Sequence, residues 1–312
     1  MQNNGNGKKT IVADISLFFV ALFWGLNFVV IKESLEIITP FAYLGIRFTL
    51  AGIILIPLFW KRLVKANCKD YLAGCLIGLF LFGGFAFQTI GLLYTTPANS
   101  GFITGSAVII VPFLYFIITR RSPGWPAFVG GGLAAIGLYL LSSGDTFGIS
   151  FGDALTLVGA FMFAAHIISI SFNVVKRDPL VLAFTQIIFT GLVSLALALI
   201  FEPTEDMFIQ PPLIWAAILY AIIFCTIGAF VTQTLAQRFT PPVHAVLILS
   251  LEAVFAGVFS YFFWEELFTM KKLSGAFFIF AGILLTELHP YVKARVTARQ
   301  ASIVRRGLPP LE

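Results

Sequence analysis

Ten long apolar stretches, separated by short polar or turn-forming segments, make up almost the whole chain. Most are close to the ~20 residues that a helix needs to cross ~30 Å of hydrocarbon. The pattern therefore predicts an all-α polytopic membrane protein with ten transmembrane helices. The stretches are Ile15–Ile31, Phe41–Trp60, Tyr71–Tyr94, Ala98–Thr119, Trp125–Leu141, Ala154–Val175, Leu180–Phe201, Leu213–Leu235, Val243–Trp264 and Leu273–Leu288.

The composition excludes a soluble protein built from buried core helices. Hydrophobic residues make up 59% of the chain and charged residues 11%, with a mean hydropathy of +0.95. Ten apolar helices with almost no polar faces leave no residues for a wet exterior. The first stretch follows Lys8 and Lys9 as a signal peptide would. No small-residue cleavage pattern closes it, so we interpret it as a retained helix.

Lysine and arginine are distributed unequally between alternate loops. With ten crossings and a cytoplasmic N-terminus, sixteen of them fall on the cytoplasmic side and three, Lys32, Lys271 and Lys272, on the other. This asymmetry follows the positive-inside rule. We therefore expect a multi-pass protein of a bacterial inner membrane with both termini in the cytoplasm. Its basic tail, residues 289–312, would meet anionic lipid heads, and no basic stretch carries the aromatic residues typical of nucleic-acid binding.

The two halves of the chain are related in sequence. At an offset of 145 residues, Gly83–Thr89 aligns with Gly228–Thr234, and an offset of 139 relates earlier positions. Apolar helices resemble one another by composition alone, but shared polar and proline positions argue for a true repeat. Five helices in each half would make the second half inverted, so we predict two inverted five-helix repeats at residues 11–142 and 151–288. Matching pairs are Asp14 and Asp153, Ala21 and Ala160, Pro40 and Pro179, Gly52 and Gly191, Thr95 and Thr240, Pro97 and Pro242, Gly130 and Gly275, and Gly137 and Gly282.

Three motifs resemble tandem EamA-type domains of the drug/metabolite transporter superfamily over nearly the whole chain. They are Phe23-Trp24-Gly25-Leu26-Asn27-Phe28, then Asn99-Ser100-Gly101-Phe102-Ile103 leading to Val111-Pro112, and Leu251-Glu252-Ala253-Val254-Phe255-Ala256 followed by Trp264-Glu265-Glu266. Family members usually carry Leu-Glu-Pro where this chain has Leu251-Glu252-Ala253, so the family's helix break after Glu252 is not predicted here.

The resemblance implies a ten-helix basket that opens alternately to the two sides of the membrane. Its central cavity would be lined by the first, third, fourth, sixth, eighth and ninth helices. The expected function is secondary transport, with export as the expected direction, of small metabolites such as amino acids. A lipid-scrambling or structural membrane protein is the alternative function, because only cavity polarity separates it from a solute carrier. An intramembrane enzyme is a further, less favoured alternative.

Glu252 stands near the middle of the stretch Val243–Trp264, with apolar residues on both sides. A charge at mid-bilayer costs ~2.5–3.5 kcal/mol on insertion scales. One interpretation is a proton or cation site, because desolvation disfavours the charged form and lets the carboxyl take up a proton. The other is a structural acid that is neutral or hydrogen-bonded to a neighbouring helix.

Arg47 lies within the second stretch and keeps its charge, so it must reach water, an interface or a partner. It would bind a substrate carboxylate, pair with Glu252, or satisfy loop carbonyls near the outer face. The repeat places Gln186 at the equivalent position.

Other polar and aromatic residues inside the stretches are candidates for the cavity wall. Gln88 and Gln233 are repeat mates, as are Asn27 and His166. Each would bind a polar ligand or form hydrogen bonds that lock the helices together, and a lone histidine most often packs. The full candidate set is Trp24, Asn27, Tyr43, Gln88, Asn99, Thr104, His166, Gln233 and Glu252, with Arg47 as a charge partner.

The sequence predicts neither an enzyme nor a cofactor or metal site. The three histidines, His166, His244 and His289, have no metal-binding spacing, and Cys68, Cys75 and Cys225 are too scattered for a cluster. No nucleotide-binding motif is present, because the glycine pairs lie within apolar helices. The expected partners are a small-molecule substrate, membrane lipid, and a proton or another coupling ion. No feature sets an oligomeric state.

Overall fold

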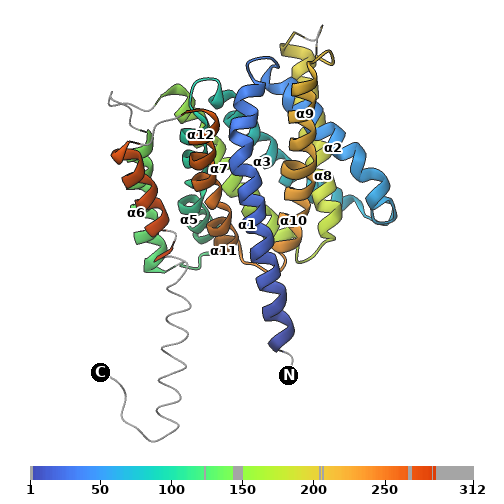
Figure 1. Ribbon diagram of the computed structural model, residues 1–312. Helices are drawn as coiled ribbons and strands as arrows, with labels where there is room; N and C mark the ends of the chain where they lie inside the picture. The colour runs from blue at the N-terminus through green and yellow to red at the C-terminus, as the bar shows by residue number, and fades with distance from the viewer. Residues whose placement is uncertain are drawn as a thin grey trace, which may run out of the picture.

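The computed structural model describes residues 3–142 except Pro123, residues 150–265 except Thr204 and Asp206, and residues 269–285 except Ile283. These residues form helices and turns, with no strand among them (Figure 1). The predicted tail, residues 289–312, and Glu266 lie outside the described residues. The elements are α1 Asn3–Ser34, α2 Pro40–Leu63, α3 Cys68–Leu92, α4 Pro97–Gly105, α5 Ala107–Thr119, α6 Trp125–Ser142, α7 Phe151–Asn173, α8 Pro179–Phe201, α9 Pro212–Tyr220, the π-helical η1 Ala221–Gly228, α10 Ala229–Ala236, α11 Pro242–Leu249 and α12 Leu251–Phe263.

Eight helices are long and apolar enough to cross a membrane. They are Lys9–Ser34, Pro40–Leu63, Cys68–Leu92, Pro97–Thr119, Phe151–Asn173, Pro179–Phe201, Pro212–Ala236 and Pro242–Phe263. Many large apolar side chains on them are exposed, for example Leu58, Ile200 and Leu213, as expected for surfaces that face lipid. The predicted count of ten is not confirmed. The two remaining predicted spans, α6 and the helical segment at residues 270–282, are not among these eight, and the apolar helix found within α6 is the shorter Phe128–Gly137.

Proline and polar caps set where most of these helices begin. Five helices, α2, α4, α8, α9 and α11, begin at a proline. A proline at this position loses no hydrogen bond, because the first N–H groups of a helix have no partner within it. Capping boxes begin two more helices: Asn67 pairs with Asp70 at α3, and Ser150 with Asp153 at α7.

Helices α2 and α8 occupy equivalent places in the two halves and pack against each other through repeat-related residues. At Gly52, no Cβ atom would fit beside Ile188, and at Gly191 none would fit beside Thr49. The offset of 139 relates Gly52 to Gly191 and Thr49 to Ile188. The contact is therefore made twice, once from each half, and it requires glycine because the backbones approach so closely.

The fourth and ninth predicted spans are each interrupted at a serine. Ser106 separates α4 from α5, and Ser250 separates α11 from α12. At each serine the hydrogen bonding tightens to the three-residue pattern: Ile109 N donates to Ser106 O over 2.9 Å, and Ala253 N to Ser250 O over 3.1 Å. A short 3₁₀ turn within a helix is typical of a hinge. The break thus precedes Glu252 instead of following it.

The two interrupted spans also end alike. Arg120 after α5 has φ 58°, and Glu265 after α12 has φ 52°. Left-handed backbone at non-glycine residues is uncommon, yet these two positions are related by the offset of 145. Sequence repeat and backbone geometry therefore agree at the ends of these spans, while the breaks at Ser106 and Ser250 differ by one position from the offset.

Candidate functional site

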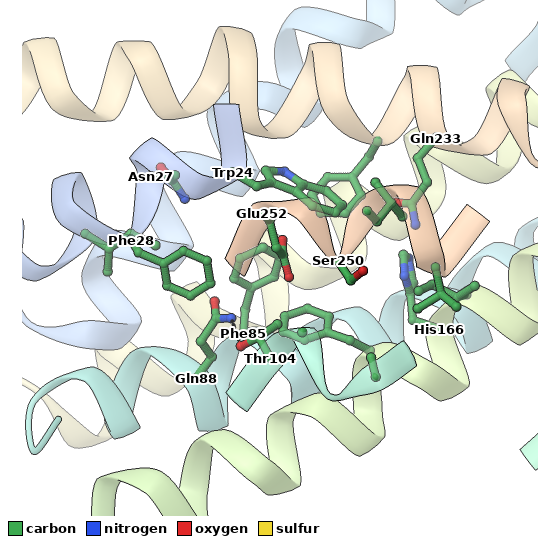
Figure 2. Close-up of a pocket in the computed structure, with 18 residues that line it drawn as sticks. Trp24, Asn27, Phe28, Phe85, Gln88, Thr104, His166, Gln233, Ser250 and Glu252 are labelled. Atoms are coloured by element: carbon green, nitrogen blue, oxygen red, sulfur yellow. Dashed lines mark hydrogen bonds between the residues drawn. The ribbon is translucent and has the colours of Figure 1, made fainter. Parts of the chain in front are cut away.

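A narrow cavity of about 50 Å³ lies where α1, α3, α4, α5, α7, α10, α11 and α12 meet (Figure 2). Since one water needs roughly 10–15 Å³ of such space, it has room for only a few waters and must widen to admit a metabolite. Its lining residues are Trp24, Asn27, Phe28, Ile31, Phe85, Gln88, Thr104, Gly105, Ala107, Phe163, His166, Ile167, Phe230, Gln233, Val246, Leu249, Ser250 and Glu252.

The cavity wall is built from repeat-related pairs. Eight pairs supply sixteen of the eighteen lining residues, and all follow the two offsets, 139 and 145, that the sequence shows. The pocket therefore lies between the two halves, and equivalent positions of each half line it. The pairs are Trp24 and Phe163, Asn27 and His166, Phe28 and Ile167, Phe85 and Phe230, Gln88 and Gln233, Thr104 and Leu249, Gly105 and Ser250, and Ala107 and Glu252.

Aromatic rings in mutual contact form much of the wall. Phe230 is central, because its ring centre lies 5.3 Å from that of Trp24 and 5.9 Å from those of Phe85 and His166. Phe163 packs edge-on against Phe85 at 5.2 Å. These separations are typical of favourable aromatic pairs, so the rings hold one another in place around the pocket.

Glu252 is the only carboxyl group of the wall. Its side chain is 8% exposed, and within the described part of the chain it has no hydrogen bond or ion pair. Figure 2 shows it reaching into the pocket from the first turn of α12. An unpartnered buried carboxylate is costly, so the site favours either its protonated form or a ligand that supplies a positive charge.

Three other polar residues of the wall, Gln88, Thr104 and His166, already have side-chain hydrogen bonds. Gln88 Nε2 donates to Thr104 Oγ1 over 2.8 Å. His166 Nε2 lies 2.6 Å from Gln186 Oε1, and Gln186 Nε2 donates to Thr234 Oγ1 over 3.0 Å. Because that amide oxygen can only accept, His166 carries its proton on Nε2 in this arrangement.

Arg47 and Tyr43 lie outside the cavity wall. Arg47 is fully buried behind Phe85, with its guanidinium carbon 5.1 Å from that ring centre. Its Nε donates to Thr226 Oγ1 over 2.7 Å and its Nη2 to the Cys225 carbonyl over 3.1 Å. In this structure it binds a hydroxyl and a carbonyl of η1 and not Glu252, and its Nη1 has no hydrogen-bond partner among the described residues. Tyr43 is buried one turn earlier on α2.

Seven candidate residues thus line one cavity: Trp24, Asn27, Gln88, Thr104, His166, Gln233 and Glu252. Asn99 does not, since it lies in the first turn of α4, where its N–H donates to Thr96 Oγ1 over 3.2 Å.

Sequence reasoning left several wall residues out of the candidate set. Phe28, Phe163, Phe230 and Ser250 line the pocket although none of them was a candidate. The offset of 139 would have found Phe163, since it is the mate of the candidate Trp24. The offset of 145 gives no such signal for Ser250, because its mate is a glycine. Ser250 is distinguished instead by the break between α11 and α12.

Over the residues that the structure describes, no group of three or more His, Cys, Asp or Glu side chains is placed to hold a metal ion. Cys68, Cys75 and Cys225 are free thiols.

Comparison with known proteins gives one consistent family. The profile of the EamA-like transporter family matches residues 11–143 and again residues 150–288. An uncharacterized transporter of Archaeoglobus fulgidus is 34% identical over 287 residues, which cover 92% of this chain and 89% of that protein. The uncharacterized transporter YetK of Bacillus subtilis is 25% identical, with 90% and 88% covered.

Two further similarities are more partial or more distant. The uncharacterized inner membrane transporter YedA of Escherichia coli K12 is 28% identical over 155 residues, 48% of this chain and 50% of that protein. A solved structure, named only as the crystal structure of a protein, has a TM-score of 0.68 at 16% identity and covers 89% of this chain and 96% of its own. That likeness concerns the fold alone.

Proposed function

The chain belongs to the EamA-like transporter family, and on this basis we propose that it is a secondary transporter that exports small metabolites by alternating access. Amino acids and related compounds are the proposed cargo. The protein is a multi-pass membrane protein, and its proposed location is a bacterial inner membrane, as the name of the relative YedA suggests. Its proposed energy source is a proton or another ion gradient.

The observation that carries this proposal is the pocket built from repeat mates. A site formed by equivalent positions of two inverted halves can be exposed to either side by the same rocking motion run in opposite directions. Two inverted halves of five helices each need ten crossings. We therefore also propose that α6 and the segment near residues 269–285 complete this number. A Cβ at Gly137 would meet the Gly275 carbonyl and one at Gly282 the Gly130 carbonyl, so these two helices cross at repeat-related glycines.

Two repeat-related hydrogen bonds at opposite ends of the bundle support alternating access. Thr95 Oγ1, before α4, donates to Asp153 Oδ1 over 2.7 Å, and Thr240 Oγ1, before α11, donates to Asp14 Oδ1 over 3.0 Å. Each joins the first helix of one half to the fourth of the other. Figure 1 shows the α3–α4 and α10–α11 connections at opposite ends of the bundle. We propose that each bond closes one end of the transporter.

The ends differ in their charged contacts. At the Thr95 end, Lys32 Nζ donates to the Leu92 carbonyl over 2.6 Å and to the Thr95 carbonyl over 3.1 Å. At Asp14, the Oδ2 atom also lies 3.3 Å from His244 Nε2. The repeat mate of His244 is Asn99, which cannot carry a charge.

Flux through the purified protein in liposomes tests the proposal. We expect saturable movement of at least one radiolabelled compound from a panel of amino acids, amines and vitamins, slowed by mutation of pocket residues. A fluorescent lipid in the same vesicles reports lipid scrambling, which the proposal does not expect. Scrambling without solute flux would overturn it and support the lipid-scrambling alternative. Export is tested separately in cells, where overproduction should lower the internal level of the transported compound.

A further inference from the structure

The pocket contains one acidic group in an otherwise neutral and aromatic wall. We propose that it binds an organic cation, an ammonium group on a compact apolar body, with Glu252 as the counter-ion. This inference rests on the proposed function and narrows its substrate class from small metabolites in general to amines.

The charges around the pocket favour a cation. Glu252 is the only carboxyl among the lining residues, and none of them is lysine or arginine. His166 is the other titratable lining residue, and its Nε2 is held by Gln186 at 2.6 Å. An ammonium group would give Glu252 the partner that it lacks, and paired charges are tolerated in a buried site where single ones are not.

A carboxylate on the ligand would find no matching cation. Arg47 lies outside the wall, behind the Phe85 ring, where its Nε and Nη2 are hydrogen-bonded to Thr226 and the Cys225 carbonyl. It also stacks near the rings of Phe48 and Phe85, at 4.9 and 5.1 Å from their centres. Bringing it into the pocket would break both hydrogen bonds. A zwitterion therefore gains one ion pair and leaves its own carboxylate without one.

The aromatic wall suits the body and the charge of such a ligand. Trp24, Phe28, Phe85, Phe163 and Phe230 line the same space as Glu252. Aromatic faces attract ammonium groups within about 6 Å, and they also pack against apolar chains or rings. The combination of one carboxylate with several rings therefore matches an amine better than a sugar or an anion.

The asymmetry of the two halves gives the ligand one orientation. The repeat mate of Glu252 is Ala107, so the wall has a carboxyl from the second half and none at the equivalent position of the first. An ammonium group should lie at Glu252 while the apolar body extends toward the rings. The present space of about 50 Å³ favours a compact ligand.

Three compounds with the same ring separate the classes: 2-phenylethylamine, phenylalanine and 2-phenylethanol. In thermal-stability titrations of the purified protein at neutral pH, we expect the amine to raise Tm at concentrations about tenfold lower than either of the others. Equal or stronger stabilisation by phenylalanine, or no stabilisation by the amine at millimolar concentration, would overturn the inference. This comparison needs no variant.

Variants then test the counter-ion. Glu252→Gln should abolish the amine effect, Glu252→Asp should weaken it, and Glu36→Gln, which removes an exposed carboxyl beyond α1, should leave it intact. An amine effect that survives Glu252→Gln would show that another group binds the cation and would overturn the assignment.

Liposome flux distinguishes this inference from the proposed function. If the protein moves neutral or zwitterionic compounds and leaves amines behind, the substrate class is wrong and the transporter stands. If no solute moves in either direction, the transporter proposal fails, and the amine proposal fails with it.

Discussion

The guanidinium Nη2 of Arg47 donates to the carbonyl oxygen of Cys225 over 3.1 Å, inside the bundle and far along the chain from its own helix. Trp24 Nε1 donates to the same oxygen over the same distance. Cys225 lies in the π-helical turn η1, where the wider hydrogen-bond pattern leaves carbonyls available to side chains. Two residues of the first half thus hold an irregular turn of the second half beside the pocket.

We expect Arg47→Lys to destabilise the protein. A lysine ammonium is one point donor and cannot reach both Thr226 and Cys225 as the guanidinium does. Losing one charge-assisted bond in a fully buried position should cost ~1.5–3 kcal/mol and lower Tm in detergent. Arg62→Lys is the matched control, since Arg62 makes its salt bridge to Asp178 at the surface and should change Tm little. Equal losses for both variants would contradict this account of Arg47.

The close contact between α2 and α8 should not tolerate even one methyl group in place of a glycine hydrogen. Because no Cβ fits at Gly191 beside Thr49, Gly191→Ala should force the two helices apart and cost ~1–3 kcal/mol. Gly132→Ala provides the opposite control, because nothing lies within 4 Å of a Cβ at that helical position. It should be neutral or slightly stabilising. Thermal unfolding of both variants checks the pair, and a neutral Gly191→Ala would refute the close packing.

Removing the charge of Glu252 should separate stability from activity. Without a ligand, this carboxyl is buried and has no partner among the described residues, so Glu252→Gln removes a cost of burial. We expect its Tm without ligand to equal or exceed that of the native protein, while flux falls by at least about tenfold. A clear drop in Tm would instead favour a structural acid that holds a neighbouring helix.

The sequence predicts the helices well because each one must satisfy its own backbone in lipid and therefore shows as a long apolar run. Eight of the predicted stretches coincide with helices long enough to cross a membrane. The repeat offsets also locate pairs such as Gln88 with Gln233 and Asn27 with His166, all on the cavity wall.

Features that depend on contacts between distant segments were not predictable. The break at Ser250 has no adjacent proline or glycine, and the single glycine beside Ser106, Gly105, resembles the many glycines inside unbroken helices, so only the packed backbone reveals the two breaks. The π-helical turn at Ala221–Gly228 lies in a run of ordinary apolar residues. For Arg47 the sequence leaves three partners open, and the observed ones, Thr226 and the Cys225 carbonyl inside η1, are none of these. Tyr43 and Asn99 were candidates by residue type, but their helices direct them away from the cavity wall.

Alternate exposure of one pocket to the two membrane faces is the central claim, and cysteine accessibility tests it most directly. Ala107→Cys would place a thiol on the cavity wall of a protein whose Cys68, Cys75 and Cys225 are replaced by alanine. Its reaction with a membrane-impermeant reagent is then timed in right-side-out and inside-out vesicles. We expect Asp153→Asn, which weakens the bond to Thr95, to speed labelling from one face, and Asp14→Asn, which weakens the bond to Thr240, to speed it from the other. Labelling from a single face in every variant, or acceleration of the same face by both, would contradict the account.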